Sequence, residues 1–236
     1  MVADKFKGWS EVRQNLCAVK SKISEAAVLA ARNPSDVNLI AISKTQKTNL
    51  ITGAIAEGHR LFGENRVQES EEKWPPLLEA NNDVVLHLVG PLQTNKVKRA
   101  VKLFHAIQTL DRRKLARALA REFDSQGVQI DCFIQINIGE EPQKMGVLPE
   151  AADDFIAECR KDFFLPIVGL MCIPPVNDQV GLHFGLLSEI AKRNGLANIS
   201  MGMSGDFEIA VRFGATHVRL GTAIFGARPP LNVGPE

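Results

Sequence analysis

The 236-residue chain contains no tyrosine, has a net charge of only +1 and has no long apolar run. Without tyrosine, it cannot supply a phenol as an acid or base. Without an excess of charge of one sign, no overall field attracts nucleic acid or a membrane surface. No apolar stretch approaches the roughly 20 residues that span a bilayer, and the opening MVADKFKGWS lacks the apolar core of a signal peptide. We therefore expect a cytoplasmic protein that binds neither nucleic acid nor membrane.

Cysteine and histidine are also sparse, and their spacing does not indicate a metal site. The four cysteines show no CxxC pair, and the five histidines show no ligand-like spacing. Cys132 and Cys172 lie within apolar runs, which is typical of small core residues. We expect no bound metal and a reducing environment.

The chain opens with helical periodicity and continues with short apolar runs. Apolar residues from Val12 to Ala30 follow helical spacing, which predicts a helix over about 10–33 that ends at Asn33-Pro34. Amphipathic stretches, such as 112–123 and 178–193, then alternate with candidate strands. The eight candidate strands lie within residues 37–44, 60–65, 84–90, 103–111, 130–138, 165–174, 198–204 and 217–226.

This alternation of strands and helices predicts a parallel sheet of the α/β class. Eight such units in about 200 residues favour a single (β/α)8 TIM-type barrel over about 37–228, with an extra N-terminal helix, in one domain that spans 1–236. A doubly wound open sheet is the main alternative. That fold expects a glycine-rich phosphate turn after the first strand, whereas here the first strand ends in SKTQ.

In such a barrel, chemistry gathers at the C-terminal ends of the strands. The residues at those ends are unusually polar or small: Lys44, Asn65, Gly90, Asp111, Asn137, the 171–174 turn, Ser204 and Gly221-Thr222. Because alternate side chains of a strand share a face, Arg219 and Gly221 are predicted to point inward. In the preceding strand, Ser200, Gly202 and Ser204 are predicted to point inward, and Ile199, Met201 and Met203 outward.

An amine, an inward guanidinium and small polar residues are the groups that pyridoxal 5′-phosphate requires. Ser204 and Gly205 open a predicted helix, whose free N–H groups can hold a phosphate, and Asp206 would have to point away as an N-cap. The alternative for Lys44 is an ion pair with Asp111 or Glu64.

Five motifs point to one family: AISKTQ, FGENRVQE, HLVGPLQTNK, GLMCIP and the 29-residue stretch from Ser200 to Arg228. Together they resemble the pyridoxal phosphate homeostasis protein family, which is similar in fold to the N-terminal barrel of alanine racemase, a fold-type III barrel. The resemblance implies that Lys44 carries pyridoxal 5′-phosphate as an internal aldimine and that Asn65 lies near the ring. It implies further that Ser204, Gly221 and Thr222 hold the phosphate and that Arg219 faces the pyridine nitrogen.

Three further residues bear on the predicted site. His87 is either a barrel-wall histidine bonded to a neighbour or a group beneath the cofactor ring. Gln46 stands where many relatives have a second lysine, so any role of that lysine would fall to Lys47 or be lost. Met145 lies between Lys144 and Gly146, where relatives often have a small polar residue.

The absence of tyrosine favours a carrier over an enzyme. Alanine-racemase-like chemistry resembles a two-base scheme of lysine and tyrosine, and this chain cannot supply the second base. A permanent cation such as Arg219 beside the ring nitrogen disfavours the protonated pyridinium that makes the ring an electron sink. We expect a monomeric regulator that exchanges the cofactor with apo-enzymes. The alternatives are an amino-acid racemase or decarboxylase using Lys44 alone or with His87, and a cofactor-free Schiff-base aldolase.

Overall fold

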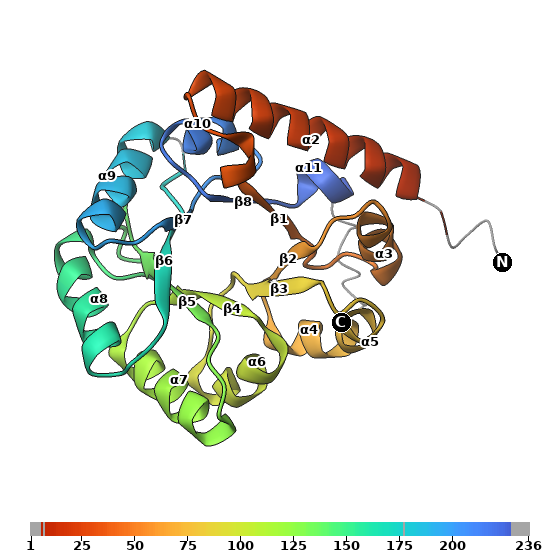
Figure 1. Cartoon of the computed structure of the whole chain (residues 1–236). Coiled ribbons are helices and arrows are strands. Elements are labelled where there is room, and N and C mark those ends of the chain that lie inside the picture. Colours follow the sequence, from red (N-terminus) through yellow and green to blue (C-terminus); the bar gives the residue numbers. More distant parts are fainter. Residues whose placement is uncertain (1–5, 7, 177, 228–236) are drawn as a thin grey trace, which may run out of the picture.

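The computed structural model describes residues 6, 8–176 and 178–227. Within these residues, eight parallel strands close into a barrel in sequence order, and β8 pairs with β1 (Figure 1). The α/β barrel fold class is thereby confirmed, and the open sheet is excluded. The strands are β1 Asn38–Ile42, β2 Leu61–Glu64, β3 Val85–Leu88, β4 Ala106–Leu110, β5 Asp131–Ile136, β6 Ile167–Cys172, β7 Asn198–Ser200 and β8 His217–Leu220.

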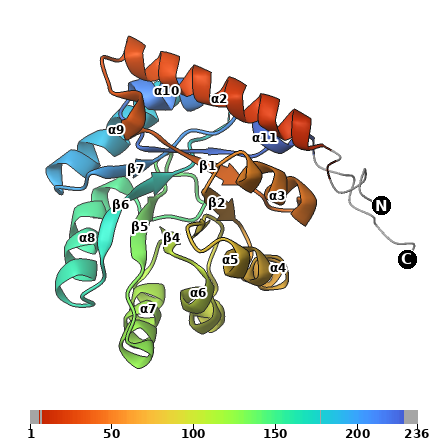
Figure 2. The ribbon, with the colours of Figure 1, turned by 45° about the vertical axis from the view of Figure 1, so that its right-hand side comes forward.

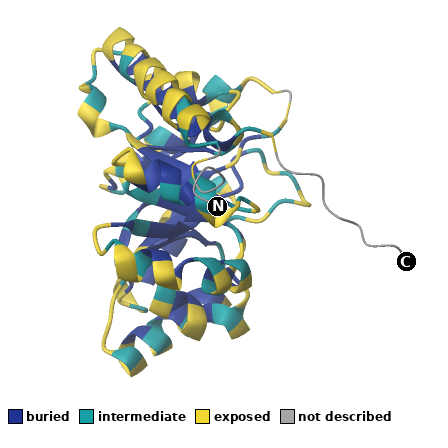
Figure 3. Ribbon diagram, turned by 90° about the vertical axis from the view of Figure 1, so that its right-hand side faces the viewer, coloured by how far each residue is buried: buried dark blue, intermediate teal, exposed yellow. Residues whose placement is uncertain are grey.

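The strands are buried because helices cover the outside of the barrel and side chains fill its inside. Figure 3 shows this as a dark-blue centre between helices whose outer faces are yellow. Each strand lies within one of the eight expected runs, but two runs are only partly extended. β7 has three residues, and the last run divides into β8 and a short helix, α11 (Thr222–Phe225).

Helices follow the strands around the outside of the barrel (Figures 1 and 2). Their bounds are α3 Thr48–Ala56, α4 Val67–Lys73, α5 Pro75–Ala80, α6 Val97–Leu103, α7 Arg113–Gln126, α8 Ala152–Lys161, α9 Val180–Arg193 and α10 Phe207–Arg212. Short 3-10 turns occupy Pro34–Asp36, Thr94–Lys96 and Pro149–Ala151. No helix in the described part of the chain is long and apolar enough to cross a lipid bilayer.

The N-terminal helix α2 (Trp9–Leu29) lies across α10, α11 and α3, on the outside of the barrel (Figures 1 and 2). It ends at Leu29, four residues before the expected stop at Asn33. Asn33 instead caps the following 3-10 turn, where its side chain accepts a hydrogen bond from the Ser35 amide over 3.1 Å. The expected end of the barrel, near residue 228, lies just outside the described residues.

Candidate functional site

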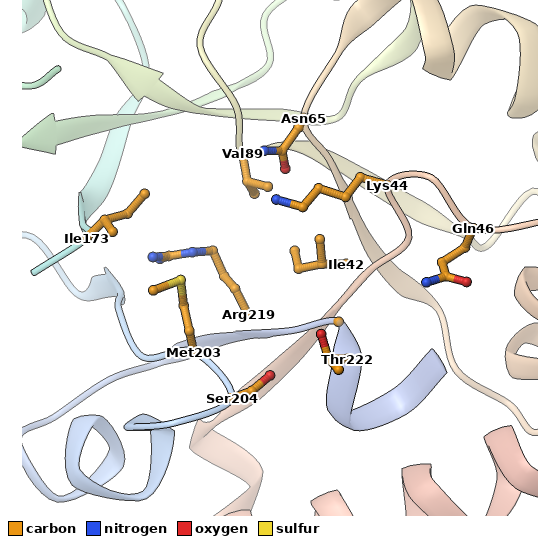
Figure 4. Close-up of a pocket in the computed structure, with 11 residues that line it drawn as sticks. Ile42, Lys44, Gln46, Asn65, Val89, Ile173, Met203, Ser204, Arg219 and Thr222 are labelled. Atoms are coloured by element: carbon orange, nitrogen blue, oxygen red, sulfur yellow. The ribbon is translucent and has the colours of Figure 1, made fainter. Parts of the chain in front are cut away.

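A cavity opens at the C-terminal ends of the strands, where the sequence predicted chemistry (Figure 4). Its lining comes from segments that follow β1, β2, β3, β6, β7 and β8, and from β1 and β8 themselves. The lining residues are Ile42, Lys44, Gln46, Asn65, Val89, Ile173, Met203, Ser204, Arg219, Gly221 and Thr222. Six of the seven predicted site residues are therefore brought together, and His87 is the exception.

Lys44 lies on the turn after β1. The buried residues Leu39, Ile40 and Ala41 anchor the strand, and Thr45 then adopts a positive φ of 61°, which turns the chain sharply. The half-buried Lys44 side chain extends into the cavity, where Figure 4 shows its amine near Asn65 and Val89. An amine presented from a fixed turn is suited to meet a carbonyl group.

A second lysine holds this turn in place. The Lys73 amine, on α4, donates to the Ser43 carbonyl over 2.8 Å and lies 2.7 Å from a carboxylate oxygen of the fully buried Glu64. The same Glu64 oxygen accepts from the Ser43 hydroxyl over 2.6 Å and from the Trp74 indole over 3.0 Å. Glu64, one of the two expected alternative partners of Lys44, is thus bonded to Ser43, Lys73 and Trp74. The other, Asp111, pairs with Arg112.

Arg219 enters the cavity from β8 and is only 6% exposed. Its Nη1 donates to the Ser200 hydroxyl over 2.8 Å, and its Nη2 donates to the Cys172 carbonyl over 2.7 Å. Burial lowers the pKa of the guanidinium, although an arginine keeps its charge in proteins. Both of these acceptors are neutral, so the site presents a buried positive charge that favours an anion or a lone pair.

Ser204, Gly221 and Thr222 form the edge of the cavity near the start of α11, and Figure 4 shows the two hydroxyl side chains on the same side of Arg219. A Cβ at Gly221 would lie 3.1 Å from the Ile42 carbonyl oxygen, so the ends of the paired strands β1 and β8 pack closely there. Asp206 turns to the backbone instead, and its carboxylate accepts from the Met203 amide over 2.6 Å. This edge is suited to an anion, because its two hydroxyl groups can donate hydrogen bonds and no carboxylate is among the described lining residues.

Asn65 is held by the close approach of the next strand end. A Cβ on Gly90 would lie 2.2 Å from the Asn65 carbonyl oxygen, so only glycine fits at position 90. The two segments can therefore lie side by side, which directs the half-buried Asn65 into the cavity (Figure 4).

His87 lies deeper in the barrel and does not line the cavity. It is 7% exposed, and its Nδ1 lies 2.9 Å from the Gln108 amide nitrogen. Burial, followed by the neighbouring His217 and His105, lowers the pKa of His87 to about 3. The structure thus has the hydrogen-bonded wall histidine that was one of the two expectations for this position.

Met203 corrects the expectation drawn from strand alternation. It was expected to face outward, but it lines the cavity beside Arg219 (Figure 4). The reason is that β7 ends at Ser200 and that Gly202 has a φ of 92°, so alternation no longer applies. Ile42 and Val89 were also missed, because apolar residues in apolar runs carry no signal of exposure to a cavity.

Two polar strand-end residues stay outside the cavity. Asp111 pairs with Arg112, and burial raises the pKa of its carboxyl group. The Asn137 amide donates to the Glu141 carbonyl over 2.9 Å and so stabilises its own loop. Both residues serve local structure.

The chain is similar to proteins of one family over most of its length. The family model described as alanine racemase, N-terminal domain, matches residues 14–229. A pyridoxal phosphate homeostasis protein of Pasteurella multocida (strain Pm70) is 36% identical over 227 residues, which cover 92% of this chain and 97% of the relative. PipY of Synechococcus elongatus PCC7942, solved with PLP bound, is 34% identical with a TM-score of 0.74; the match covers 86% of this chain and 100% of PipY.

A more distant likeness concerns the fold alone. An alanine racemase of Clostridium difficile 630 is 15% identical, with a TM-score of 0.71, and the match covers 94% of this chain and 58% of the racemase. The present chain therefore shares the barrel part of that longer protein.

Proposed function

The chain belongs to the pyridoxal phosphate homeostasis protein family, and we propose that it binds pyridoxal 5′-phosphate (PLP) in the cavity at the mouth of its barrel. The observation that carries the proposal is the meeting of Lys44, Arg219 and the Ser204–Thr222 hydroxyl edge on one cavity. PLP needs an amine for its aldehyde, a partner for its ring nitrogen and donors for its phosphate. Lys44 follows β1, Ser204 follows β7, and Arg219 and Thr222 come from the end of β8, so closure of the barrel brings three separate segments together.

In this proposal, Lys44 holds the cofactor covalently as a Schiff base. Its neutral amine would form a C=N bond with the aldehyde carbon of PLP, and the two amine hydrogens and the aldehyde oxygen would leave together as water. Ser204, Gly221 and Thr222 receive the phosphate, and Asn65 lies beside the ring. The half-buried position of Lys44 and the fixed turn beneath it reduce the conformational entropy lost on binding.

Arg219 is assigned to the ring nitrogen, and this assignment favours storage of the cofactor over catalysis. A guanidinium is always charged and only donates hydrogen bonds. Beside the ring nitrogen it opposes protonation, so the ring accepts electrons poorly and carbanions are weakly stabilised. The chain also has no tyrosine to act as a second base. We therefore propose a PLP-binding protein without robust catalysis of its own.

The biological role proposed is PLP homeostasis in the cytoplasm. The protein would bind PLP as a monomer, keep it from reacting with other amines, and release it to apo forms of PLP-dependent enzymes. The relatives' names support this role, since they are named for homeostasis and not for an enzymatic reaction.

The first test is the visible absorbance of the purified protein, followed by borohydride reduction and peptide mapping. We expect a yellow protein whose reduced label maps to Lys44, and a colourless Lys44→Ala variant. The matched control is Lys47→Ala, which removes an exposed lysine three residues away that does not line the cavity. A colourless wild-type protein that PLP cannot reconstitute would overturn the proposal and favour the aldolase alternative.

A second test separates carrier from enzyme. In one assay, the loaded protein is mixed with an apo PLP-dependent enzyme, and recovery of that enzyme's activity is measured. In a parallel assay, the loaded protein alone is given amino acids, and their racemisation or decarboxylation is measured. Efficient transfer without turnover supports the carrier. Tight retention of PLP together with racemisation or decarboxylation would point to the enzyme alternative.

A further inference from the structure

A chain of buried hydrogen bonds runs from Arg219 across the interior of the barrel. Arg219 Nη1 donates to Ser200 Oγ over 2.8 Å, and the Ser200 hydroxyl donates to Gln108 Oε1 over 2.6 Å. The Gln108 amide nitrogen lies 2.9 Å from His87 Nδ1. The four residues lie on β8, β7, β4 and β3, and none is more than 7% exposed. Such a polar chain is unusual where a barrel interior is normally filled by branched apolar side chains.

The direction of each bond in this chain follows from chemistry. An arginine can only donate, so Ser200 accepts with a lone pair and its single hydrogen is directed to Gln108 Oε1. The amide of Gln108 is then fixed with its oxygen toward Ser200 and its nitrogen toward His87. His87 accepts at Nδ1 and is therefore neutral, with its proton on Nε2. The low pKa of His87, about 3, agrees with this arrangement.

This chain of hydrogen bonds also restricts the orientation of the Arg219 guanidinium. Ser200 holds Nη1, and the Cys172 carbonyl holds Nη2 over 2.7 Å. Without an acceptor at Gln108, the Ser200 hydroxyl can rotate, and one of the two points that hold Arg219 becomes loose. If the Ser200 hydrogen turns toward Arg219, no lone pair faces Nη1, and that hydrogen bond is weakened because its energy depends on the angle at the acceptor.

We propose that Gln108, acting through Ser200, is a positioning residue that aims Arg219 at the ring nitrogen of bound PLP. This inference rests on the proposed function and adds to it a residue that contacts neither the cavity nor the cofactor. Gln108 is absent from the cavity lining and fully buried. His87 completes the chain by holding the far end of the Gln108 amide.

The test compares PLP with an analogue in which C–H replaces the ring nitrogen. Dissociation constants for both are measured by absorbance titration of the full-length wild type and of Gln108→Met, Ser200→Ala and Gln108→Glu. We expect the wild type to prefer PLP by about tenfold, the value of one charge-assisted hydrogen bond. Gln108→Met and Ser200→Ala should reduce the preference to about twofold or less while the affinity for the analogue changes little. Gln108→Glu keeps an oxygen acceptor for Ser200, and its second oxygen can accept from His87 once the imidazole proton moves to Nδ1, so this variant should retain most of the preference.

The matched control is Gln129→Met, the same substitution at an exposed position, which should behave as wild type. An unchanged preference in Gln108→Met and Ser200→Ala would overturn the inference. An equal loss of affinity for both compounds would also overturn it, because Gln108 would then support the fold and not the aim of Arg219. A wild type that binds both compounds equally would remove the assignment of Arg219 but leave PLP binding intact. A wild type that binds neither would instead overturn the proposed function.

Discussion

At the scale of single residues, Lys44 depends on the buried ion pair behind it. Lys73 bonds the Ser43 carbonyl and Glu64, and it also lies 3.0 Å from Glu69. Glu69 in turn accepts from the Thr45 amide over 2.6 Å. The Lys73 ammonium therefore holds the backbone on both sides of Lys44, directly at Ser43 and through Glu69 at Thr45. Because Thr45 has a positive φ, these bonds also offset the strain of the turn.

Removal of Lys73 should destabilise the protein strongly. Lys73→Met leaves the carboxylate of Glu64 buried without its counter-charge, and breaking a buried pair costs about 3–5 kcal/mol. We expect a much smaller loss in the double variant Lys73→Met with Glu64→Gln, because no fully buried charge is then left unpaired and the remaining partner, Glu69, is partly exposed. The measurement is the free energy of unfolding in urea. Lys47→Met, at an exposed lysine, serves as control and should change it by less than about 0.5 kcal/mol.

At the scale of elements, α2 supports the short helix that carries Thr222. The Asn15 amide, on α2, donates to the Ile224 carbonyl over 3.0 Å at the end of α11. A four-residue helix has little stability of its own. The packing of α2 across α10 and α11 therefore supports the helix that carries Thr222 from outside the barrel (Figure 2).

Two leucines of α2 should respond very differently to truncation. Leu16 is 2% exposed and belongs to the core, whereas Leu29 is 73% exposed at the end of the same helix. We expect Leu16→Ala to cost about 2–5 kcal/mol of unfolding free energy, because it removes buried apolar contacts and leaves a cavity. Leu29→Ala should stay within about 0.5 kcal/mol. Equal effects in urea unfolding would show that α2 does not pack on the barrel in solution.

At the scale of the whole molecule, three buried histidines make stability depend on pH. Burial lowers the pKa of His59 and His217 to about 4 and that of His87 to about 3, from 6.5 in the unfolded chain. Below pH 6.5 the unfolded chain therefore binds protons that the folded chain does not. The contribution of these histidines to stability is then fully present above pH 6.5 and is lost as the pH falls toward 4 for His59 and His217 and toward 3 for His87.

Between pH 7 and pH 5, each of these histidines should lower the free energy of unfolding by about 2 kcal/mol. Urea unfolding at pH 7, 6 and 5 measures the slope. A His217→Gln variant removes one of the three groups and should show a shallower decline than the wild type. An unfolding free energy that stays constant over this range would contradict the burial of the neutral histidines.

Some site residues could be predicted from sequence because the fold itself places them. Lys44, Asn65 and Thr222 follow apolar runs, and the C-terminal ends of parallel strands meet at one face of a barrel. Arg219 was predictable from alternation within a regular strand. Met203 was not, because alternation fails once β7 ends and Gly202 turns the chain.

The sequence by itself determined the order of strands and helices, since apolar runs and helical periodicity are local properties that reflect burial on one or both faces. It also placed the amine, the guanidinium and the hydroxyls at strand ends. Only the tertiary structure decided which buried polar groups pair with one another. Gln108 is hydrogen-bonded to Ser200, 92 positions away in the sequence, and Lys73 is hydrogen-bonded to Ser43, 30 positions away. Such partners are set by the closure of the barrel, because distance along the chain does not determine which inward-facing side chains come into contact.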